Sequence, residues 1–561
     1  LASRWGKLEH LTKDTLWGRF ALAFEETITD LQQWYGRALE KALRRRRYVL
    51  IGILALIIAS FALVPTGFIG ATFIPPSDRG EFLVQLETAP QASLSTTDQL
   101  TQQAERLILA HPEVVNAFTN VGTQSGQMNT AGGSANANLS EINVKLVPKK
   151  DRKITSEEFG TLLRDELGTI PGLKVTVTQT NITGSAQTPI QIAVKGVEMD
   201  SLWKTARIVK RITQATPGTD YVQFSTKSPK PEVKVRLDQD RMGALGFTST
   251  DIGMAVQTAF RGNDRNKFKE AGEEYPINVR LDQADRQDVE SVRGLMVTNA
   301  KGATVRLDQL AEVYETVGNS VLQRTDRLNS ITINSAAVGR PSGTIVAEIQ
   351  KALAKEQLPA GITIQYLGDA KNQGEAFGSL GLALVLGILL VYLIMVALYE
   401  NALYPFVVLF SIPVSLVGAF LALALTMQPL SIFAIVGLIM LLGLVSKNGI
   451  LIVDFANHLR KEGMALAEAL VEAGKERLRP ILMTTVAMIF GMLPIALASG
   501  DGAEVKNGMA WVIIGGLTSS LILTLFIVPV MYYIMTRLME KVSGFRFGRR
   551  RRKVEARVAT A

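Results

Sequence analysis

Apolar residues are gathered in six stretches of the chain, one near its start and five in its last third. Each stretch is long enough for an α-helix to cross a bilayer, since about 20 residues suffice at a rise of about 1.5 Å each. Residues 70–370, between the first stretch and the others, instead alternate short strand and helix patterns. The chain therefore predicts an α+β membrane protein with six transmembrane helices and a large water-facing middle. One span is expected at 48–69 and five within 373–540, at about 377–398, 403–426, 430–456, 480–499 and 508–535.

The first part of the water-facing segment, residues 70–186, contains two helix patterns among four strand patterns. The sequence from Ser95 to Asp98 resembles a capping box that opens the first helix, and Thr155 to Glu158 opens the second. The resulting order, β-α-β-β-α-β, is typical of the ferredoxin-like arrangement. The strands are expected at 81–87, 114–121, 142–147 and 173–177.

A second unit of the same order is expected at 187–229 and 323–372. It begins with a strand, a helix and a strand, and its matching half follows only after a long interruption. The residues between the halves, 230–322, are expected to form an inserted subdomain. Within it, a polar excursion that contains glycines runs from Arg261 to Tyr275.

Basic residues flank the apolar stretches, and the net charge is +9. Arg44–Arg47 precede the first stretch, and Arg549–Arg552 follow the last. Such clusters beside membrane helices are typical of the cytoplasmic side, which explains them better than nucleic-acid binding does. Six crossings then place both ends of the chain in the cytoplasm. Residues 1–47 are expected to form amphipathic helices at the membrane surface, and 541–561 a basic tail.

The sequence lacks the residues that several kinds of chemistry require. The chain has no cysteine, so neither disulfides nor thiolate sites are expected. No phosphate-binding P-loop motif is present, so direct drive by ATP has no support. The loops show no catalytic constellation, and His10, His111 and His458 offer no metal site. We therefore expect neither an enzyme nor a bound metal or cofactor.

One lysine lies inside the apolar stretch 430–456. Lys447 stands between Ser446 and Asn448, at a depth where a charge costs about 2.5–3.5 kcal/mol on insertion scales. One interpretation is that its long stem lets the ammonium reach the lipid headgroups. The other, which we favour, is an ion or proton relay in which the lysine faces a partner inside the protein. Asp454 lies seven residues later on the same helix face, but it is better explained as the cytoplasmic end of that helix.

Three stretches together resemble one known family. They are FIPPSD at 73–78, GLVSKNGILIVD at 443–454 and RLRPILMT at 477–484. With the order of the water-facing units, they are similar to the C-terminal half of a resistance–nodulation–division (RND) transporter of the hydrophobe/amphiphile efflux branch. The resemblance covers essentially the whole chain.

The resemblance implies a multidrug efflux pump of the bacterial inner membrane, which exports hydrophobic and amphiphilic compounds by proton antiport and confers antibiotic resistance. It implies a homotrimer that works with a periplasmic adaptor and an outer-membrane channel, driven by the proton motive force. Lys447, Arg477 and Thr484 match the residues of the family's proton relay. Arg477 can alternatively be a cytoplasmic anchor, and the Thr484 hydroxyl can bond its own helix backbone.

The resemblance also assigns roles in the periplasm. The two ferredoxin-like units correspond to pore subdomains, and 230–322 corresponds to a docking subdomain. The excursion would contact another subunit or the adaptor through Asn263, Asp264 and Phe268, although a solvated loop is the alternative.

Residues 122–138 lie where the family has a flexible switch loop. This segment carries no phenylalanine, unlike the loop of well-known drug pumps, and it can also be a connector without a special role. Its candidate residues are Gly122, Gln124, Gly126, Met128 and Gly132.

Two other functions stay open. A heavy-metal exporter of the same superfamily would use soft thioether ligands, which select copper(I), but the periplasmic methionines are scattered. They are Met128, Met199, Met242, Met254 and Met296. The other alternative is a non-transporting, half-length membrane scaffold.

One expected feature is missing from the spans. RND transporters have two similar halves, and none of the apolar stretches here contains the two adjacent carboxylates that Lys447 would pair with. We therefore expect either a fragment of a longer pump or a partner chain that supplies the acids, and favour the fragment.

Overall fold

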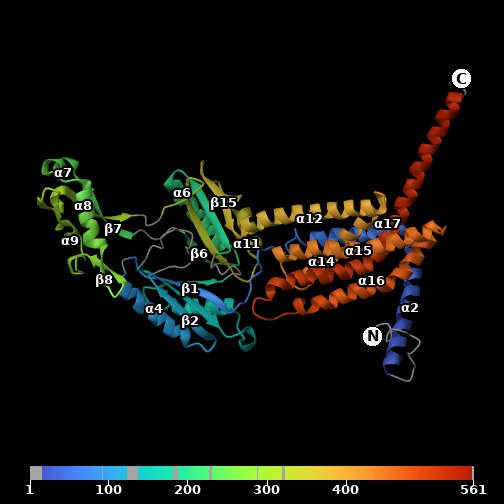
Figure 1. The fold of residues 1–561 in the computed structure, drawn as a ribbon, viewed down its shortest axis with the longest axis horizontal. Helices are drawn as coiled ribbons and strands as arrows, with labels where there is room; N and C mark the ends of the chain where they lie inside the picture. The colour runs from blue at the N-terminus through green and yellow to red at the C-terminus, as the bar shows by residue number, and fades with distance from the viewer. Residues whose placement is uncertain are drawn as a thin grey trace.

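The computed structural model describes residues 16–90, 92–122, 137–180, 188–225, 230–282, 284–286, 288–318 and 322–558. The molecule is elongated (Figure 1). A bundle of long helices occupies one end, two α/β units follow, and the inserted unit lies at the far end. The two α/β units therefore stand between the helix bundle and the insertion.

Five described helices or helix pairs are long and apolar enough to cross a membrane. A shorter apolar helix, α3 (Arg46–Ala62), has 17 residues and covers much of the span expected at 48–69. The second span is broken at Phe410, since Pro413 has no N–H to donate to the carbonyl of Leu409 four residues earlier. The long helices are α12 (Asp369–Tyr399), α13 with α14 (Leu403–Leu409 and Ser411–Leu425), α15 (Ile432–Lys461), α16 (Leu466–Ala496) and α17 (Glu504–Val558).

The ends expected for two of the spans differ from the ends of the helices. The basic residues 458–479 lie between the spans expected at 430–456 and 480–499. They are mostly helical, because α15 ends only at Lys461 and α16 already begins at Leu466. The basic tail continues α17 as far as Val558.

The buried centre of the bundle is formed by α14, α15 and α17. In the most apolar 18-residue stretch of each of these helices, half or more of the residues are buried, compared with 6% in α12 and 17% in α16. Two glycines allow α14 and α17 to approach closely: a Cβ added to Gly515 would lie 2.3 Å from the carbonyl oxygen of Gly418. The Ser519 hydroxyl also donates to the Val414 carbonyl at 3.1 Å. Small and hydroxylated residues are the usual means of close helix packing in membranes.

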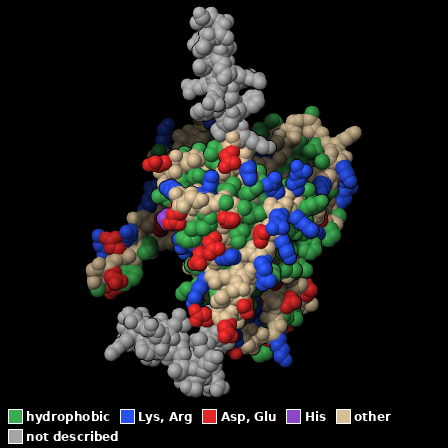
Figure 2. Space-filling model, turned by 90° about the vertical axis from the view of Figure 1, so that its right-hand side faces the viewer, with side chains coloured by type: hydrophobic (Ala, Val, Ile, Leu, Met, Phe, Trp, Pro, Cys, Tyr) green, Lys and Arg blue, Asp and Glu red, His purple; other side chains and the backbone are tan. Residues whose placement is uncertain are grey.

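The amphipathic helix expected near the start is α2 (Leu16–Arg44). Its apolar face packs on protein: Tyr35 and Leu39 are buried, and the Tyr35 hydroxyl donates to the Leu525 carbonyl of α17 at 2.6 Å. Gly474 of α16 leaves room for the Tyr35 ring, because an added Cβ would lie 2.9 Å from it. Figure 2 views the molecule from this end, where Lys and Arg side chains gather over one side of the surface. A helix at the membrane surface was expected, and the structure shows α2 packed on α16 and α17.

The first α/β unit is a four-stranded antiparallel sheet in the order β2-β3-β1-β4, with two helices in its connections. Phe82 and Val84 of the sheet share a buried cluster with Ile108 and Phe159 of the two helices. The capping box at Thr155 is present, whereas the first helix is capped by Ser93, two residues before the expected start. The elements are β1 (Glu81–Glu87), α4 (Leu94–Leu109), β2 (Val114–Val121), β3 (Leu139–Leu146), α5 (Ser156–Leu167) and β4 (Lys174–Gln179).

The second α/β unit repeats this topology across the insertion. Its central strand pairs, β6 with β14, β14 with β5 and β5 with β15, are all antiparallel and match the first sheet in order. Its core is separate, with Ile192, Val209, Ile333 and Ile349 among the buried residues. The elements are β5 (Ile190–Gly196), α6 (Met199–Ala215), β6 (Thr219–Phe224), β13 (Gln323–Thr325), β14 (Leu328–Ala337), α11 (Ser342–Leu353) and β15 (Thr363–Gly368).

The insertion begins and ends in one antiparallel pair, β7 (Lys230–Leu237) with β12 (Ala311–Gly318). Its small core includes Met242, Phe247 and Leu310. The remaining elements are α7 (Gln239–Leu245), α8 (Ser249–Val256), the π-helical turn at Gln257–Arg261, α9 (Val289–Arg293), β10 (Met296–Thr298), β11 (Thr304–Arg306) and α10 (Leu307–Leu310).

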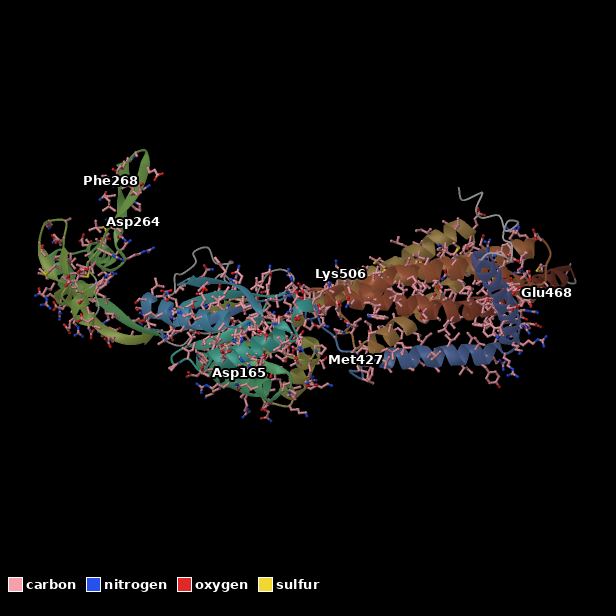
Figure 3. The ribbon with its side chains drawn as sticks, turned by 90° about the horizontal axis from the view of Figure 1, so that it is seen from below. Asp165, Asp264, Phe268, Met427, Glu468 and Lys506 are labelled. Carbon is pink, nitrogen blue, oxygen red and sulfur yellow. The ribbon has the colours of Figure 1, made fainter. Side chains whose placement is uncertain are left out.

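The excursion from Arg261 to Tyr275 is not a loop. It is most of a β-hairpin, β8 (Asn263–Glu270) with β9 (Glu273–Val279), joined by a two-residue turn at Ala271 and Gly272. Both turn residues have positive φ, 50° and 87°, as the hairpin-favouring type I′ turn requires. Figure 3 shows the hairpin with Asp264 and Phe268 projecting from the far end of the molecule. Every residue of both strands is exposed.

Candidate functional site

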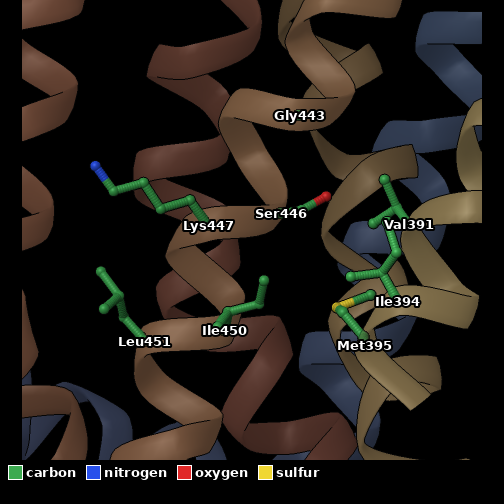
Figure 4. Close-up of a pocket in the computed structure, with 8 residues that line it drawn as sticks. All are labelled: Val391, Ile394, Met395, Gly443, Ser446, Lys447, Ile450 and Leu451. Carbon is green, nitrogen blue, oxygen red and sulfur yellow. The ribbon is translucent and has the colours of Figure 1, made fainter. Parts of the chain in front are cut away.

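Lys447 lies on α15 with its side chain on an open face of the helix. Its neighbours Ser446 and Asn448 are only 4% and 0% exposed, because successive helical residues point about 100° apart and these two face the bundle. Figure 4 shows the Lys447 ammonium directed away from Ser446 and from α12. Within the described part of the chain, it has neither an ion pair nor a hydrogen bond.

The surroundings of Lys447 are apolar. A cavity of about 290 Å³ lies between α12 and α15, lined by Val391, Ile394, Met395, Gly443, Ser446, Lys447, Ile450 and Leu451. The Ser446 hydroxyl is occupied, since it donates to the Leu442 carbonyl at 2.7 Å. Lys447 lines this cavity, but its ammonium points away from α12, and none of the described carboxylates forms an ion pair with it.

Asn448 connects this turn of α15 to α16. Its side-chain N–H₂ donates to the Thr485 hydroxyl at 3.5 Å, and both residues are fully buried. The Asn448 amide oxygen has no partner, although a buried polar atom normally has one. Thr485 is not among the residues predicted from the sequence. It directly follows the expected relay residue Thr484, but it points about 100° away around the helix and is fully buried.

The two other expected relay residues, Arg477 and Thr484, lie on α16. The Arg477 guanidinium stacks over the Phe455 ring of α15 at 4.5 Å, and its Nε is buried without a hydrogen bond. The Thr484 hydroxyl bonds its own helix, at 3.1 Å from the Pro480 carbonyl and 3.2 Å from that of Ile481. Among the described residues, no contact joins either of them to Lys447, so their part in a relay stays a prediction.

The sequence pattern of the AcrB/AcrD/AcrF family matches residues 5–536. The chain belongs to this family of RND transporters. Two relatives are 30% identical over 519 residues, which are 90% of this chain and 48% of theirs: "Cation efflux system protein CzcA" of Alcaligenes sp. (strain CT14) and "Cobalt-zinc-cadmium resistance protein CzcA" of Cupriavidus metallidurans. "Swarming motility protein SwrC" of Bacillus subtilis is 27% identical over 535 residues, 95% of this chain and 50% of its own.

The fold is also similar to a solved RND structure. The X-ray structure of a heavy metal efflux pump superposes with a TM-score of 0.74 at 25% identity, over 90% of this chain and 52% of that one. The chain thus spans about half the length of the relatives that it matches. RND proteins are transporters and not enzymes.

These similarities change one expectation. The RND family is confirmed, but the hydrophobe/amphiphile branch finds no support, because the relatives named for a substrate are cation pumps. Within the described ranges, no group of three or more His, Cys, Asp or Glu side chains could hold a metal ion.

The RND chain connects its membrane helices to its α/β units through short, specific joints. Strand β15 of the second unit passes directly into α12 at Gly368, whose φ of 61° and ψ of −138° suit only glycine. The first unit is joined to the start of α17 by an ion pair between Lys149 and Glu504 and by a bond from the Gly502 N–H to the Asp78 carbonyl at 3.1 Å. A shift of α12 or α17 would therefore act directly on one of the units.

The expected periplasmic candidates are only partly visible. In the β8–β9 hairpin, Asn263 and Asp264 are exposed, and Phe268 is 53% exposed opposite Tyr275, which is 50% exposed. Gly122, the first residue of the segment 122–138, has φ of 81°, and its N–H donates to the Leu139 carbonyl at 2.8 Å. Gln124, Gly126, Met128 and Gly132 lie outside the described residues.

Proposed function

We propose that this chain is the second half of a proton-driven exporter of metal cations in the bacterial inner membrane. The observation that carries the proton-driven part is Lys447, an unpaired charge on an open face of a membrane helix. The metal substrate rests on the two relatives described as cation and cobalt-zinc-cadmium exporters. The unit that exports is the complete pump, of which this chain supplies one half.

The open face of α15 provides a physical basis for coupling. An ammonium in an apolar site is stable only beside a counter-charge, so the complete pump would place carboxylates against Lys447. A nearby ammonium favours the ionised form of such carboxylates, and the arrival of a proton weakens the pair. That exchange can bias α15 between two packings, which is how a local charge change becomes a movement.

The joints described above would carry such a movement outward. In this proposal, α12 moves the second α/β unit through Gly368, while α17 moves the first unit through Lys149 and Glu504. The two units have separate cores, so each can move as a body. Alternate opening and closing of the space between the two α/β units would then move the substrate.

The proposed topology and assembly follow the family. The short helix α3 would be the sixth crossing, so that both ends of the chain lie in the cytoplasm. The α/β units would be periplasmic pore subdomains in a trimer, with an adaptor and an outer-membrane channel as partners. The β8–β9 hairpin would dock onto a neighbouring subunit.

The test uses the complete pump expressed in a strain that lacks it. Growth is measured against cobalt, zinc and cadmium salts and, separately, against amphiphilic dyes. We expect the wild type to restore metal tolerance and Lys447→Ala to abolish it, with Lys506→Ala as the control because that lysine is exposed near the start of α17. Unchanged metal tolerance in Lys447→Ala would refute the role of this lysine in proton coupling. Protection by the wild type against dyes but not against metals would refute metal cations as the substrate.

A further inference from the structure

Two arginines from different helices converge on one tyrosine at the end of the bundle that carries α2. The guanidinium carbon of Arg46, at the start of α3, lies 5.1 Å from the centroid of the Tyr533 ring on α17. The guanidinium carbon of Arg537, one turn further along α17, lies 5.6 Å from the same centroid. Cation–π attraction to the shared ring holds both charges in place.

Neither of these charges is neutralised. Within the described ranges, no carboxylate lies within ion-pairing distance of Arg46 or Arg537. Nearby acids have other partners, since Glu40 pairs with Arg44 at 2.7 Å and Glu540 approaches Arg460 at 3.9 Å. Two like charges that share one aromatic ring repel each other unless an anion accompanies them, so the arrangement favours the binding of an anion.

The neighbourhood of the two arginines is amphipathic. Arg45 and Arg47 are exposed beside Arg46, and Tyr48 follows them with 77% exposure. On α17, Leu538 and Met539 are 55% and 44% exposed directly after Arg537. The basic side of this end of the molecule is visible in Figure 2. Exposed apolar and aromatic side chains next to unpaired guanidinium groups suit a ligand that has an anionic head and apolar chains.

We propose that Arg46, Tyr533 and Arg537 form a binding site for the phosphate headgroup of an anionic phospholipid. The guanidinium plane matches a phosphate in two parallel hydrogen bonds, and the acyl chains would lie along α3 and α17. Basic pockets between membrane helices are known to bind such headgroups. The site bridges α3 and α17, so a bound lipid would hold these two helices together. The proposal requires α3 and α17 to be membrane helices and is independent of the exported substrate.

The test measures lipid binding by the complete purified protein. Native mass spectrometry follows the titration of phosphatidylglycerol, with phosphatidylcholine as the neutral comparison. Arg46→Gln and Arg537→Gln are each expected to weaken phosphatidylglycerol binding at least about fivefold, the factor that corresponds to about 1 kcal/mol for one arginine near a lipid surface. Arg47→Gln removes the same charge from the same cluster without touching Tyr533, and it should change binding by less than about twofold.

The remaining outcomes are decisive in either direction. Equal losses in all three glutamine variants would show diffuse attraction to a basic surface and would overturn the site, as would unchanged binding in Arg46→Gln and Arg537→Gln. Binding of inorganic phosphate as tight as that of phosphatidylglycerol would overturn the assignment to a lipid, because the acyl chains would then contribute nothing. Arg46→Lys keeps the charge but loses the planar guanidinium fork, so it should bind the lipid less tightly than the wild type and more tightly than Arg46→Gln, and binding equal to that of the wild type would contradict recognition through the guanidinium plane.

Discussion

Two charged residues in this chain lie in opposite situations. Lys447 has an open face and no counter-charge among the described residues, whereas Arg152 is buried against a carboxylate. The Arg152 side chain is 1% exposed and pairs with Asp78, which also accepts a bond from the Ser156 hydroxyl at 2.6 Å. The FIPPSD motif thus ends in a structural anchor, which ties the segment after α3 to the start of α5. The first charge is available for function and the second holds the fold.

The Asp78–Arg152 pair predicts a pH-dependent stability. Burial raises the pKa of Asp78, but the bonds from Arg152 and Ser156 and the arginine charge outweigh it and hold that pKa below its usual value. The pair therefore stabilises the protein above the unfolded pKa of about 3.9, and this contribution is lost as the pH falls below it.

Asp78→Asn should therefore lower the free energy of unfolding by about 3 kcal/mol at neutral pH, because it leaves a buried guanidinium unpaired. Melting temperatures of the wild type and the variant at pH 7 and below pH 4 test this, and the difference between them should shrink in acid. Asp165→Asn is the control, since that side chain is 72% exposed in its pair with Arg164. Equal effects of the two substitutions would contradict the anchor.

At the scale of elements, the contact between α14 and α17 depends on glycine. Gly418 and Gly515 place the two backbones where no side chain fits, and Ser519 adds a hydrogen bond across the contact. Because α17 also begins at the joint with the first α/β unit, its position affects the bundle and that unit together.

Gly515→Ala should separate α14 from α17, since the added Cβ would lie 2.3 Å from a carbonyl oxygen that cannot move alone. We expect a loss of about 1–3 kcal/mol in stability, typical of overpacking, together with reduced export. Gly491→Ala on α16 is the matched control, because nothing lies within 4 Å of its added Cβ. Melting temperature and metal tolerance measured on both variants check the prediction, and equal behaviour would contradict it.

At the scale of the whole molecule, the β8–β9 hairpin is far from the helix bundle, and no other described residue covers it (Figure 1). Isolated two-stranded hairpins are marginally stable in water, and this one exposes Phe268, Tyr275, Ile277 and Val279. Such an apolar projection is expected to be covered in an assembly.

Phe268→Ser should therefore weaken the proposed trimer while leaving the melting temperature of the subunit unchanged, because the side chain is 53% exposed. Light scattering after size-exclusion chromatography measures the mass of the complete protein. Val197→Ser is the control, since that valine is 78% exposed and lies outside the hairpin. Trimers of equal stability in both variants would show that the hairpin is not a subunit contact.

The sequence by itself determined which elements this chain forms. The length of its apolar stretches, the alternation in its strands and the capping box at Thr155 depend on neighbouring residues only, and the helices and strands lie where these patterns predict them. The order of the elements also indicated the split second unit. Two stretches differed from the local patterns. α16 begins at Leu466, well before the span expected at 480–499, and packs there against α2, whereas the polar excursion is a hairpin closed by a two-residue turn at Ala271 and Gly272.

Only the tertiary structure decided which residues meet. β14 pairs with β5 and β6 across the whole insertion, Asn448 meets Thr485, and Arg46 and Arg537 meet at Tyr533. Each contact joins residues that are far apart in the chain, so it depends on how helices cross and sheets align, which local periodicity does not encode. Lys447 was identified from sequence because a charge in an apolar span is costly wherever the span packs. That its side chain lies on an exposed face of α15 depends on how the other helices pack, so only the tertiary structure shows it.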